Sequence, residues 1–391
     1  MICVGIDVAK EKHDCCIINL DGGIPAAPFT IPNNKEGFLS LYDRIRASGG
    51  TRDNVKVGLE ATGHYSYNIL GFLIEKGLPT FVINPMHTNL YRKSLSLRKT
   101  KTDKVDCKAI ARMLMSDVDC QSYSSASYHN EELKSLTRYR FDKVRERAKL
   151  KASIARLVVI LFPELEALVP SLHLNTVYQL LLEFPGASYV AEAHLTRLAN
   201  LIRAASQGRY GKDKAIEIRN AARKSIGSVM PAKSLELRHT VRLIGELDSE
   251  IADVESRIRA MMDEIHSPIT TIPGINYRMG AMILAEIGDF SRFKSADNIL
   301  AYAGMSPTTY QSGCFESTHA RMEKRGSKYL RYALFNATKY VCLWDPVFQE
   351  YLAKKRAEGK HYNVAITHAA KKLVRVIFAL EKSGQPYRKV R

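Results

Sequence analysis

The sequence predicts an α/β domain at its amino end, followed by a chain that is mainly helical. Three observations predict this fold class. Apolar runs of strand length alternate with helix signals over about the first 115 residues, the composition beyond residue 128 is helical, and apolar residues follow a heptad pattern between residues 241 and 265. At 391 residues the chain is long enough for two or three domains, since single cores usually stop growing near roughly 250–300 residues.

The first domain is predicted from its turn and capping signals. Asp21-Gly22-Gly23 is a hairpin turn, Asn33 or Asn34 can cap a helix, and Gly77 ends one. In chain order the predicted elements are strands over 2–8, 14–20 and 26–31, a helix over 35–48, a strand over 55–60, a helix over 67–76, a strand over 80–84 and a helix that begins near residue 102. This β-β-β-α-β-α-β-α order is the RNase H-like topology, a mixed sheet with helices on both faces.

Four acids lie where this topology brings them to one edge of the sheet. Asp7 is on the first strand and Glu60 ends the fourth, while Asp103 and Asp106 open the last helix on one face, with Thr102 as its cap. Hard cations such as Mg²⁺ prefer carboxylate oxygens and bridge them to phosphates. A two-metal site of this kind orients the attacking oxygen and stabilises the leaving oxygen. The implied reaction is phosphodiester cleavage.

The alternative is that each acid is a separate turn or helix-start residue. Asp7 argues against it, because an acid inside the apolar run of residues 2–8 needs a partner or a metal. Asp14, Asp53 and Asp117 have no comparable setting.

The middle of the chain is predicted to contain two long helices. Residues 128–161 are strongly basic, and the cations that we expect to contact nucleic acid are Arg138, Arg140, Lys143, Arg145 and Arg147. Residues 235–265 carry a heptad seam formed by Val241, Ile244, Leu247, Ile251, Val254, Ile258, Met261 and Ile265. Periodicity does not decide between a helical hairpin with residues 133–161 and a dimeric coiled coil. Residues 171–230 are predicted to form an inserted helical subdomain.

Two further motifs lie in the C-terminal part. The segment 271–275, Thr-Ile-Pro-Gly-Ile, followed by a helix over 279–287, resembles a helix-hairpin-helix turn, in which Gly274 helps to hold a phosphate through backbone amides. A helix C-cap at Gly274 is the alternative. Ser312 stands before a glycine ahead of a basic stretch that includes Lys324, Arg325, Lys328 and Arg331. On its own, Ser-Gly is ordinary turn chemistry.

Composition points to a polyanionic partner. The 58 Lys and Arg residues outnumber the 40 Asp and Glu residues, which gives a formal charge of +18. The apolar runs are too short to span a bilayer, and the start of the chain lacks the features of a signal peptide. Seven cysteines without a C-x-x-C pair suit reduced thiols. We therefore expect a cytosolic protein that does not bind membranes.

Five ordered motifs resemble the IS110/IS1111 family of insertion-sequence transposases over essentially the whole chain. They are GIDVAKEKHD near the start, GLEATGHY at 58–65, KTDKVDCKAIA at 101–111, TIPGI at 271–275 and LAYAGMSPTTYQSG at 300–313. The resemblance implies a RuvC-like DEDD domain over 1–127, a helical coiled-coil region over 128–267 and a C-terminal transposase domain over 268–391. It also implies a bacterial protein of the cytosol and nucleoid.

The resemblance also implies a mechanism. The four acids of the family fall on Asp7, Glu60, Asp103 and Asp106, and its catalytic serine falls on Ser312. The family implies strand cleavage and rejoining of donor and target DNA through a serine–phosphate link assisted by Mg²⁺, with Mn²⁺ as an alternative. It implies a homo-oligomer, a dimer or tetramer, whose two sites come from different subunits. It further implies a structured noncoding RNA, encoded by the element, that guides the protein.

One departure from the family pattern leaves the alignment open. The Ser-Lys that the family often has before a glycine is here Met322-Glu323-Lys324-Arg325-Gly326, so the other candidate nucleophiles are Ser306, Ser317 and Ser327. Two other functions stay open from the sequence. One is a structure-selective nuclease, similar to junction resolvases, that uses metal-activated water. The other is a non-catalytic nucleic-acid scaffold, against which the four intact acids argue.

Overall fold

The computed structural model describes residues 1–19, 21–60, 63–83, 88, 91, 103–116, 125–307, 311–312, 315–316 and 322–388. The chain divides into two compact units. One consists of Met1–Glu132 with Gly288–Lys294, and the other of Leu133–Ile287 with Ser295–Arg391. Most of the middle and C-terminal regions belongs to the second unit, and their division into two domains stays a prediction.

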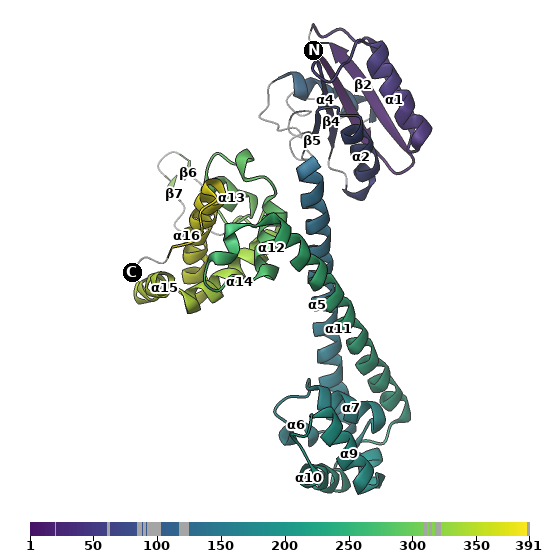
Figure 1. The fold of residues 1–391 in the computed structure, drawn as a ribbon, viewed down its shortest axis with the longest axis vertical. Coiled ribbons are helices and arrows are strands. Elements are labelled where there is room, and N and C mark those ends of the chain that lie inside the picture. Colours follow the sequence, from purple (N-terminus) through teal and green to yellow (C-terminus); the bar gives the residue numbers. More distant parts are fainter. Residues whose placement is uncertain are drawn as a thin grey trace. The chain divides into compact units, whose positions relative to one another are not determined.

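The first unit is built on a five-stranded mixed sheet in the order β3-β2-β1-β4-β5 (Figure 1). Its strands are β1 (Ile2–Val8), β2 (Lys12–Asn19), β3 (Ala26–Pro32), β4 (Val55–Glu60) and β5 (Thr80–Ile83). β2 is antiparallel to both β1 and β3, while β4 is parallel to both β1 and β5. The predicted mixed sheet is thus confirmed.

The helices of this unit begin and end at residues that the sequence marks. They are α1 (Lys35–Ala47), α2 (Tyr67–Glu75), which follows the 3-10 turn Gly63–Ser66, and α4 (Asp103–Met115). Asn34 caps α1 by accepting a hydrogen bond of 2.8 Å from the Gly37 amide. Gly77 follows α2 with a left-handed φ of 69°. Thr102, the predicted cap of α4, lies outside the described residues.

Helices cover both faces of the sheet. Side chains alternate between the two faces along each strand. Val4 and Leu59 belong to the apolar cluster that contains residues of α1 and α2, including Leu41. Cys3 and Cys16 belong instead to clusters with residues of α4. α1 and α2 therefore pack on one face and α4 packs on the other.

Two paired glycines let α4 approach the sheet closely. Gly5 of β1 and Gly58 of β4 are neighbours in the parallel register. A Cβ atom at Gly5 would lie 2.0 Å from the Cys107 carbonyl oxygen and 2.6 Å from the Ala111 nitrogen, and one at Gly58 would lie 2.8 Å from Leu114 Cδ1. The backbone of α4 at Gly5, and the Leu114 side chain at Gly58, thus occupy the space that a side chain on the strand would fill.

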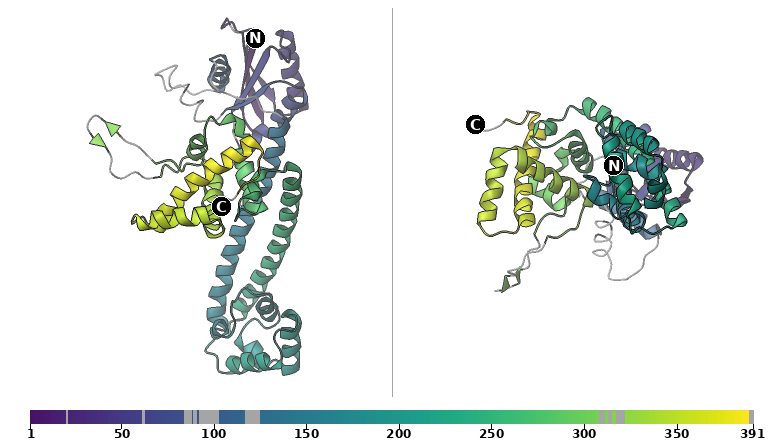
Figure 2. Two further views of the ribbon diagram at one scale, coloured as in Figure 1. Left: turned by 60° about the vertical axis from the view of Figure 1, so that its left-hand side comes forward. Right: turned by 90° about the horizontal axis from the view of Figure 1, so that it is seen from below.

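Two long helices, α5 (Ser125–Leu161) and α11 (Pro231–Ile265), run side by side in the second unit (Figures 1 and 2). The seam of α11 is buried within the single chain, the arrangement expected for the intramolecular hairpin. Its buried members are Val241, Ile244, Leu247, Ile251, Val254, Ile258 and Met262. The seam ends at Met262 instead of Met261, and Ile265 is 42% exposed. A straight helix of 3.6 residues per turn drifts away from a strict heptad in this way.

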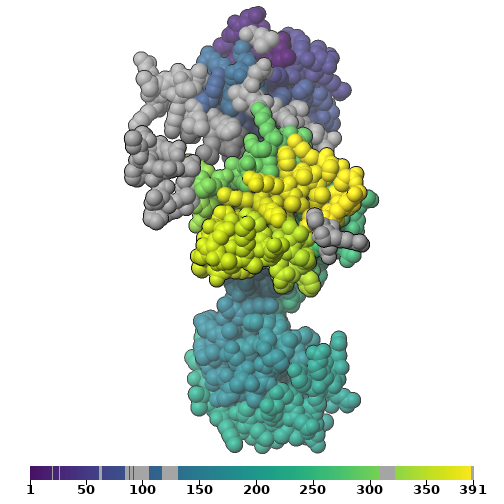
Figure 3. Space-filling view, turned by 90° about the vertical axis from the view of Figure 1, so that its left-hand side faces the viewer, coloured from purple at the N-terminus to yellow at the C-terminus, as the bar shows by residue number. Residues whose placement is uncertain are grey.

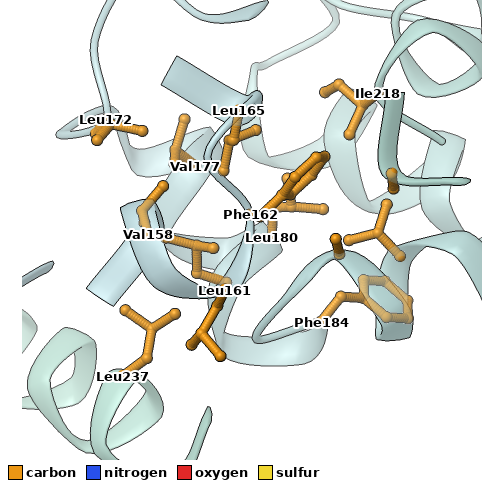
Figure 4. Close-up of a cluster of buried hydrophobic side chains, with 14 of the residues drawn as sticks. Val158, Leu161, Phe162, Leu165, Leu172, Val177, Leu180, Phe184, Ile218 and Leu237 are labelled. Carbon is orange, nitrogen blue, oxygen red and sulfur yellow. The ribbon is translucent and has the colours of Figure 1, made fainter. Parts of the chain in front are cut away.

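Five short helices between α5 and α11 share a core with both of them (Figure 4). They are α6 (Leu165–Leu168), α7 (Asn175–Glu183), α8 (Ala187–Glu192), α9 (Leu195–Ala205) and α10 (Lys212–Arg223). Phe162, at the end of α5, lies among them and is 1% exposed, and Leu237 of α11 closes the cluster. Among the described residues, no helix is long and apolar enough to cross a membrane.

The C-terminal part contributes helices and one small hairpin. Its elements are the 3-10 turn Pro268–Thr271, α12 (Tyr277–Ile287), the 3-10 turn Phe290–Arg292, α13 (Ala296–Tyr302), β6 (Gln311–Ser312), β7 (Phe315–Glu316), α14 (Lys328–Trp344), α15 (Pro346–Ala357) and α16 (Tyr362–Ser383). The antiparallel pair of β6 and β7 was not expected in a region predicted as helical. Two-residue strands leave no alternating pattern to read.

We expect Gly5→Ala to destabilise the first unit by more than about 3 kcal/mol, because the added carbon overlaps backbone atoms of α4 that cannot rotate away. Gly71→Ala in α2 is the matched control. A Cβ at Gly71 meets nothing within 4 Å, so this change should be neutral or stabilise by about 0.5–1 kcal/mol. Urea unfolding of the full chain measures both, and equal effects of the two substitutions would contradict the close-packing account.

Candidate active site

Asp7 and Glu60 lie at the carboxyl ends of adjacent parallel strands. The last registered pair between β1 and β4 is Ile6 with Leu59, so each acid is the next residue on its strand. Asp7 is two residues after Gly5, and Glu60 is two residues after Gly58, so each acid lies on the same face of the sheet as the glycine before it. Both acids therefore belong to the face that α4 covers.

Asp103 and Asp106 reach the same edge because α4 runs antiparallel to β1. The C-terminal part of α4 packs near the start of β1, where Leu114 clusters with Cys3, whereas Cys107 lies over Gly5. The first turn of α4 is thus directed toward the strand end that carries Asp7. Asp106 is 6% exposed. Asp103 is the first helical residue, and its side chain lies outside the described set.

The helix start favours negative charge at this edge. A helix N-terminus carries a partial positive charge of roughly half an elementary charge. Among the side chains that the structure describes, no group of three or more His, Cys, Asp and Glu residues has metal-binding geometry. Asp7, Glu60 and Asp106 consequently share a face and an edge without forming a closed ligand set by themselves.

A fifth acid on this face was missed in the sequence. Asp14 of β2 pairs directly with Asp7 of β1, shares the parity of Cys16 on the α4 face and is 6% exposed. Its carboxylate accepts a hydrogen bond of 2.6 Å from the hydroxyl of Thr30 on β3. The expectation that Asp14 has no setting comparable to the four acids is corrected, because it lies beside Asp7. The signal was the antiparallel register set by the preceding turn, which places residue 14 opposite residue 7.

Two thiols pack under the first turns of α4. A hydrogen bond to Cys16, together with burial, raises the pKa of the Cys107 thiol, so this thiol stays protonated. Protonated thiols are poor metal ligands, since the thiolate is the form that binds. The carboxylate oxygens at this edge are the ligand type that hard divalent cations prefer.

Ser312 lies in the small hairpin of β6 and β7, where it pairs with Phe315. The described segments on either side of this hairpin run antiparallel. Their contacts include a bridge between Pro307 and Met322 and a hydrogen bond of 3.0 Å from the Glu323 amide to the Ser306 carbonyl. These contacts define a stem below the hairpin. The side chain of Ser312 lies outside the described set.

The stem is fixed by two glycines and one arginine. A Cβ atom at Gly304 would lie 2.4 Å from the Arg325 carbonyl oxygen, and one at Gly326 would lie 2.2 Å from the Tyr302 carbonyl oxygen, so the two strands cross in close contact. Arg331 donates to the Ala303 carbonyl at 2.9 Å. The guanidinium that the sequence suggested as a phosphate contact therefore also holds the stem.

The stem is joined to α5 through a buried carboxylate. Glu286 of α12 is 1% exposed and receives two hydrogen bonds from Arg138, at 2.6 and 3.0 Å. It also accepts a hydrogen bond of 2.5 Å from the Ser327 hydroxyl, which in turn caps α14 through the Leu330 amide. Ser327 is thus engaged in structure, which weakens it as an alternative nucleophile. Ser317 lies outside the described residues.

The remaining predicted cations of the stem are on the surface. Lys324, Arg325 and Lys328 are exposed, and Lys324 has a left-handed φ of 55°. The Lys328 ammonium lies 4.8 Å from the centre of the Tyr329 ring. These three residues are accessible to a ligand, and phosphate contact by them stays a prediction.

The predicted nucleic-acid contacts of α5 have partners within the chain. The sequence predicted a strongly basic helix whose cations contact nucleic acid. In the structure Arg140, Lys143 and Arg147 form ion pairs with Glu255, Glu250 and Asp248 of α11, at 2.6, 2.8 and 2.5 Å. Together with the Arg138 pair, they join α5 to other helices. The Arg145 guanidinium lies 5.6 Å from the ring centre of Phe141.

Gly274 also has a packing role. Its φ is 91°, and a Cβ atom at this position would lie 2.6 Å from the backbone of Tyr340 in α14. The turn therefore needs glycine in order to approach α14. Whether its amides hold a phosphate stays a prediction.

Comparisons with known proteins define the class of this chain as a DNA transposase. A family model described as a transposase, of the IS110 DEDD type, matches residues 4–163. Another, described as the IS116/IS110/IS902 family of transposases, matches residues 266–353. The chain belongs to the IS110 family of transposases, and its first domain has the RuvC-like fold of the DEDD type.

Similar proteins match over nearly their full length. The pilin gene-inverting protein of Moraxella lacunata is 25% identical over 392 residues, which cover 99% of this chain and 97% of the relative. The 43.6 kDa protein of insertion element IS110 from Streptomyces coelicolor is 25% identical, with 98% and 95% covered. The transposase of element IS1111A from Coxiella burnetii is 22% identical, with 98% and 91% covered.

We expect Glu286→Ala to lower the free energy of unfolding of the second unit by about 3 kcal/mol. This loss is at the lower end of the range for a buried ion pair that loses one partner. The reason is that the Arg138 side chain is 40% exposed, so water can solvate its guanidinium in the variant. Asp248→Ala, which removes the partner of Arg147 in a more exposed pair, is the control and should cost less than about 1 kcal/mol. Urea unfolding of the full chain measures both losses. A loss in the Glu286 variant that is no larger than the loss in the Asp248 variant would contradict the anchoring role of Glu286.

Proposed function

We propose that this transposase cleaves and rejoins DNA strands with Ser312 as the nucleophile, assisted by Mg²⁺ or Mn²⁺ held by Asp7, Glu60, Asp103 and Asp106. The observation that carries the proposal is the shared edge described above. Asp7 and Glu60 end adjacent parallel strands on the face covered by α4, and the first turn of α4 is directed to the same edge.

The donor chemistry of this edge fits a hard divalent cation. The acids come from the ends of β1 and β4 and from the first turn of α4. When bound, the cation would offset negative charge on the scissile phosphate. The protein residues position the phosphate and supply the carboxylates. Asp14, hydrogen-bonded to Thr30, would keep Asp7 in a fixed environment.

The proposed serine step rests on the family resemblance, which assigns the catalytic serine to Ser312, and it is supported by the anchored stem below the hairpin that carries Ser312. Its Oγ forms a bond to phosphorus, the bond from phosphorus to the leaving sugar oxygen breaks, and a proton passes from Oγ to solvent while the leaving oxygen takes one up. The exposed cations Lys324 and Arg325, on the stem below the hairpin, are available to balance charge on the phosphate. Anchoring by Arg331 and Glu286 limits the orientations of the stem, which favours catalysis.

We also propose that a structured noncoding RNA guides the chain and that two or four copies assemble. The five motifs that resemble the IS110/IS1111 family support both statements. RNA extracted from the purified protein tests the first, and a single discrete species encoded beside the gene is expected. Heterogeneous nucleic acid would contradict guidance by such an RNA.

We expect Ser312→Ala to abolish strand exchange and the denaturant-stable protein–DNA adduct, while DNA binding is unchanged, because only the attacking oxygen is removed. Ser306→Ala is the control and should retain the adduct. The assay mixes the protein with labelled DNA from both flanks of the gene and separates products on a denaturing gel. Adduct formation by the Ser312 variant would contradict the serine role. Cleavage without any adduct in the unaltered protein would favour the metal-dependent nuclease.

A further inference from the structure

A hollow on the surface of the second unit is lined by cationic side chains that form few ion pairs among the described residues. It has a volume of about 370 Å³ and is lined by Tyr351, His368, Lys371, Lys372 and Arg375. Tyr351 comes from α15 and the other four from α16. The four residues of α16 stand at positions i, i+3, i+4 and i+7, which places them on one face of the helix. Figure 3 shows α15 and α16 at the surface of their unit.

Carboxylates do not neutralise this face. In the part of the chain that the structure describes, Lys371 and Lys372 form no ion pair. Arg375 has one contact with Asp297, at 3.5 Å, and both side chains are about two-thirds exposed. Such a pair is screened by water and contributes little. The α5 cations Arg140, Lys143 and Arg147, by contrast, lie within 2.5–2.8 Å of acids.

The surrounding segment is also basic. Residues 346–383 contain eight Lys and Arg residues against the three acids Glu350, Glu358 and Glu381. Glu358 is paired with Lys355 and Lys360, and Glu381 accepts a hydrogen bond from Ser267. Glu350 does not line the hollow.

Aromatic rings hold one of the cations in place. The Lys372 ammonium lies 5.2 Å from the ring centre of Phe348 and 5.1 Å from that of Tyr351. Burial lowers the pKa of His368, and the positive charges of Lys371 and nearby lysines lower it further. The hollow is thus electropositive and partly preorganised, which reduces the ordering cost of binding an anion.

We propose that this α16 face binds the phosphodiester backbone of the DNA substrate. Lys371 and Arg375 are four residues apart, about 6 Å along the helix. Each strand of B-DNA presents one phosphate per about 3.4 Å of axis, so the row matches about two consecutive phosphates of one strand. Backbone contact of this kind carries no sequence information and positions the duplex on the protein.

The test compares two variants that lose the same charge by the same substitution. Lys371→Gln with Lys372→Gln removes two cations of the hollow and keeps much of each aliphatic stem. Lys212→Gln with Lys224→Gln removes two exposed cations of the α9–α10 region that form no ion pair among the described residues. Binding of a short DNA duplex is measured from about 50 to about 200 mM salt.

The hollow variant should bind the duplex about tenfold or more weakly near 0.1 M salt. The slope of its log affinity against log salt should be shallower by about 1, since Lys371 is one of the two cations matched to phosphates and each lost phosphate contact removes about 0.9. The control variant should keep the slope of the unaltered protein. Equal changes in the two variants, or no change in the hollow variant, would overturn the proposal. A loss confined to a structured RNA, with duplex DNA binding intact, would also overturn it.

A second measurement uses the unaltered chain and does not depend on how the variants fold. Acetylation of surface amines is followed by mass spectrometry with and without duplex DNA. The proposal predicts that DNA protects Lys371 and Lys372 more strongly than Lys212 and Lys224. Equal protection of the four lysines would contradict it.

Discussion

The close contact of α4 with the paired glycines Gly5 and Gly58 is the constraint on which the active-site edge depends. A side chain at Gly5 would overlap the backbone of α4 and force the helix away from β1, while one at Gly58 would displace the side chains of Ile110 and Leu114. Because the contact lies only two residues before Asp7 and Glu60, it determines where the first turn of α4 meets the strand ends. The positions of the acids therefore depend on how α4 packs against β1 and β4.

A second set of contacts gives the C-terminal part its order. Glu286 is a buried carboxylate shared by Arg138 of α5 and Ser327 at the start of α14. Breaking such a pair is costly because the remaining charge loses its counterion. The stem below the Ser312 hairpin is thereby tied to the long helix α5. Ion pairs along α5 and α11 extend this pattern and use positive charge for folding that would otherwise be available for nucleic acid.

Much of the fold follows from local sequence signals, and the exceptions have a physical reason. The apolar runs of β1 and β4, the cap at Asn34 and the glycine at Gly77 predicted the first domain, whose mixed sheet the structure confirms. Asp14 was missed because its proximity to Asp7 depends on strand register. The ion pairs of α5 were missed because their acids lie about 100 residues further along the chain.

The placement of the four acids was predictable from topology, whereas the role of Ser312 came from a resemblance to a family. A strand-end acid has a position as soon as the strand order is known. A serine in a two-residue strand has no such signal. Gly304 and Gly326 lie in the stem segments before and after the hairpin, and their close contact is visible only in the structure. The lysines Lys371 and Lys372 of α16, which form no ion pair among the described residues, were likewise hidden, because a sequence does not show which charges are paired.

Binding of Mn²⁺ to the full chain, followed by electron paramagnetic resonance, tests the central claim most directly. The claim is that packing of α4 on Gly5 and Gly58 assembles a carboxylate site for a divalent cation. Asp7→Asn and Asp106→Asn should each weaken Mn²⁺ binding by about tenfold or more. Asp53→Asn, at an exposed position before β4, should leave binding unchanged. Unchanged affinity in the Asp7 and Asp106 variants, or an equal loss in the Asp53 variant, would contradict the account.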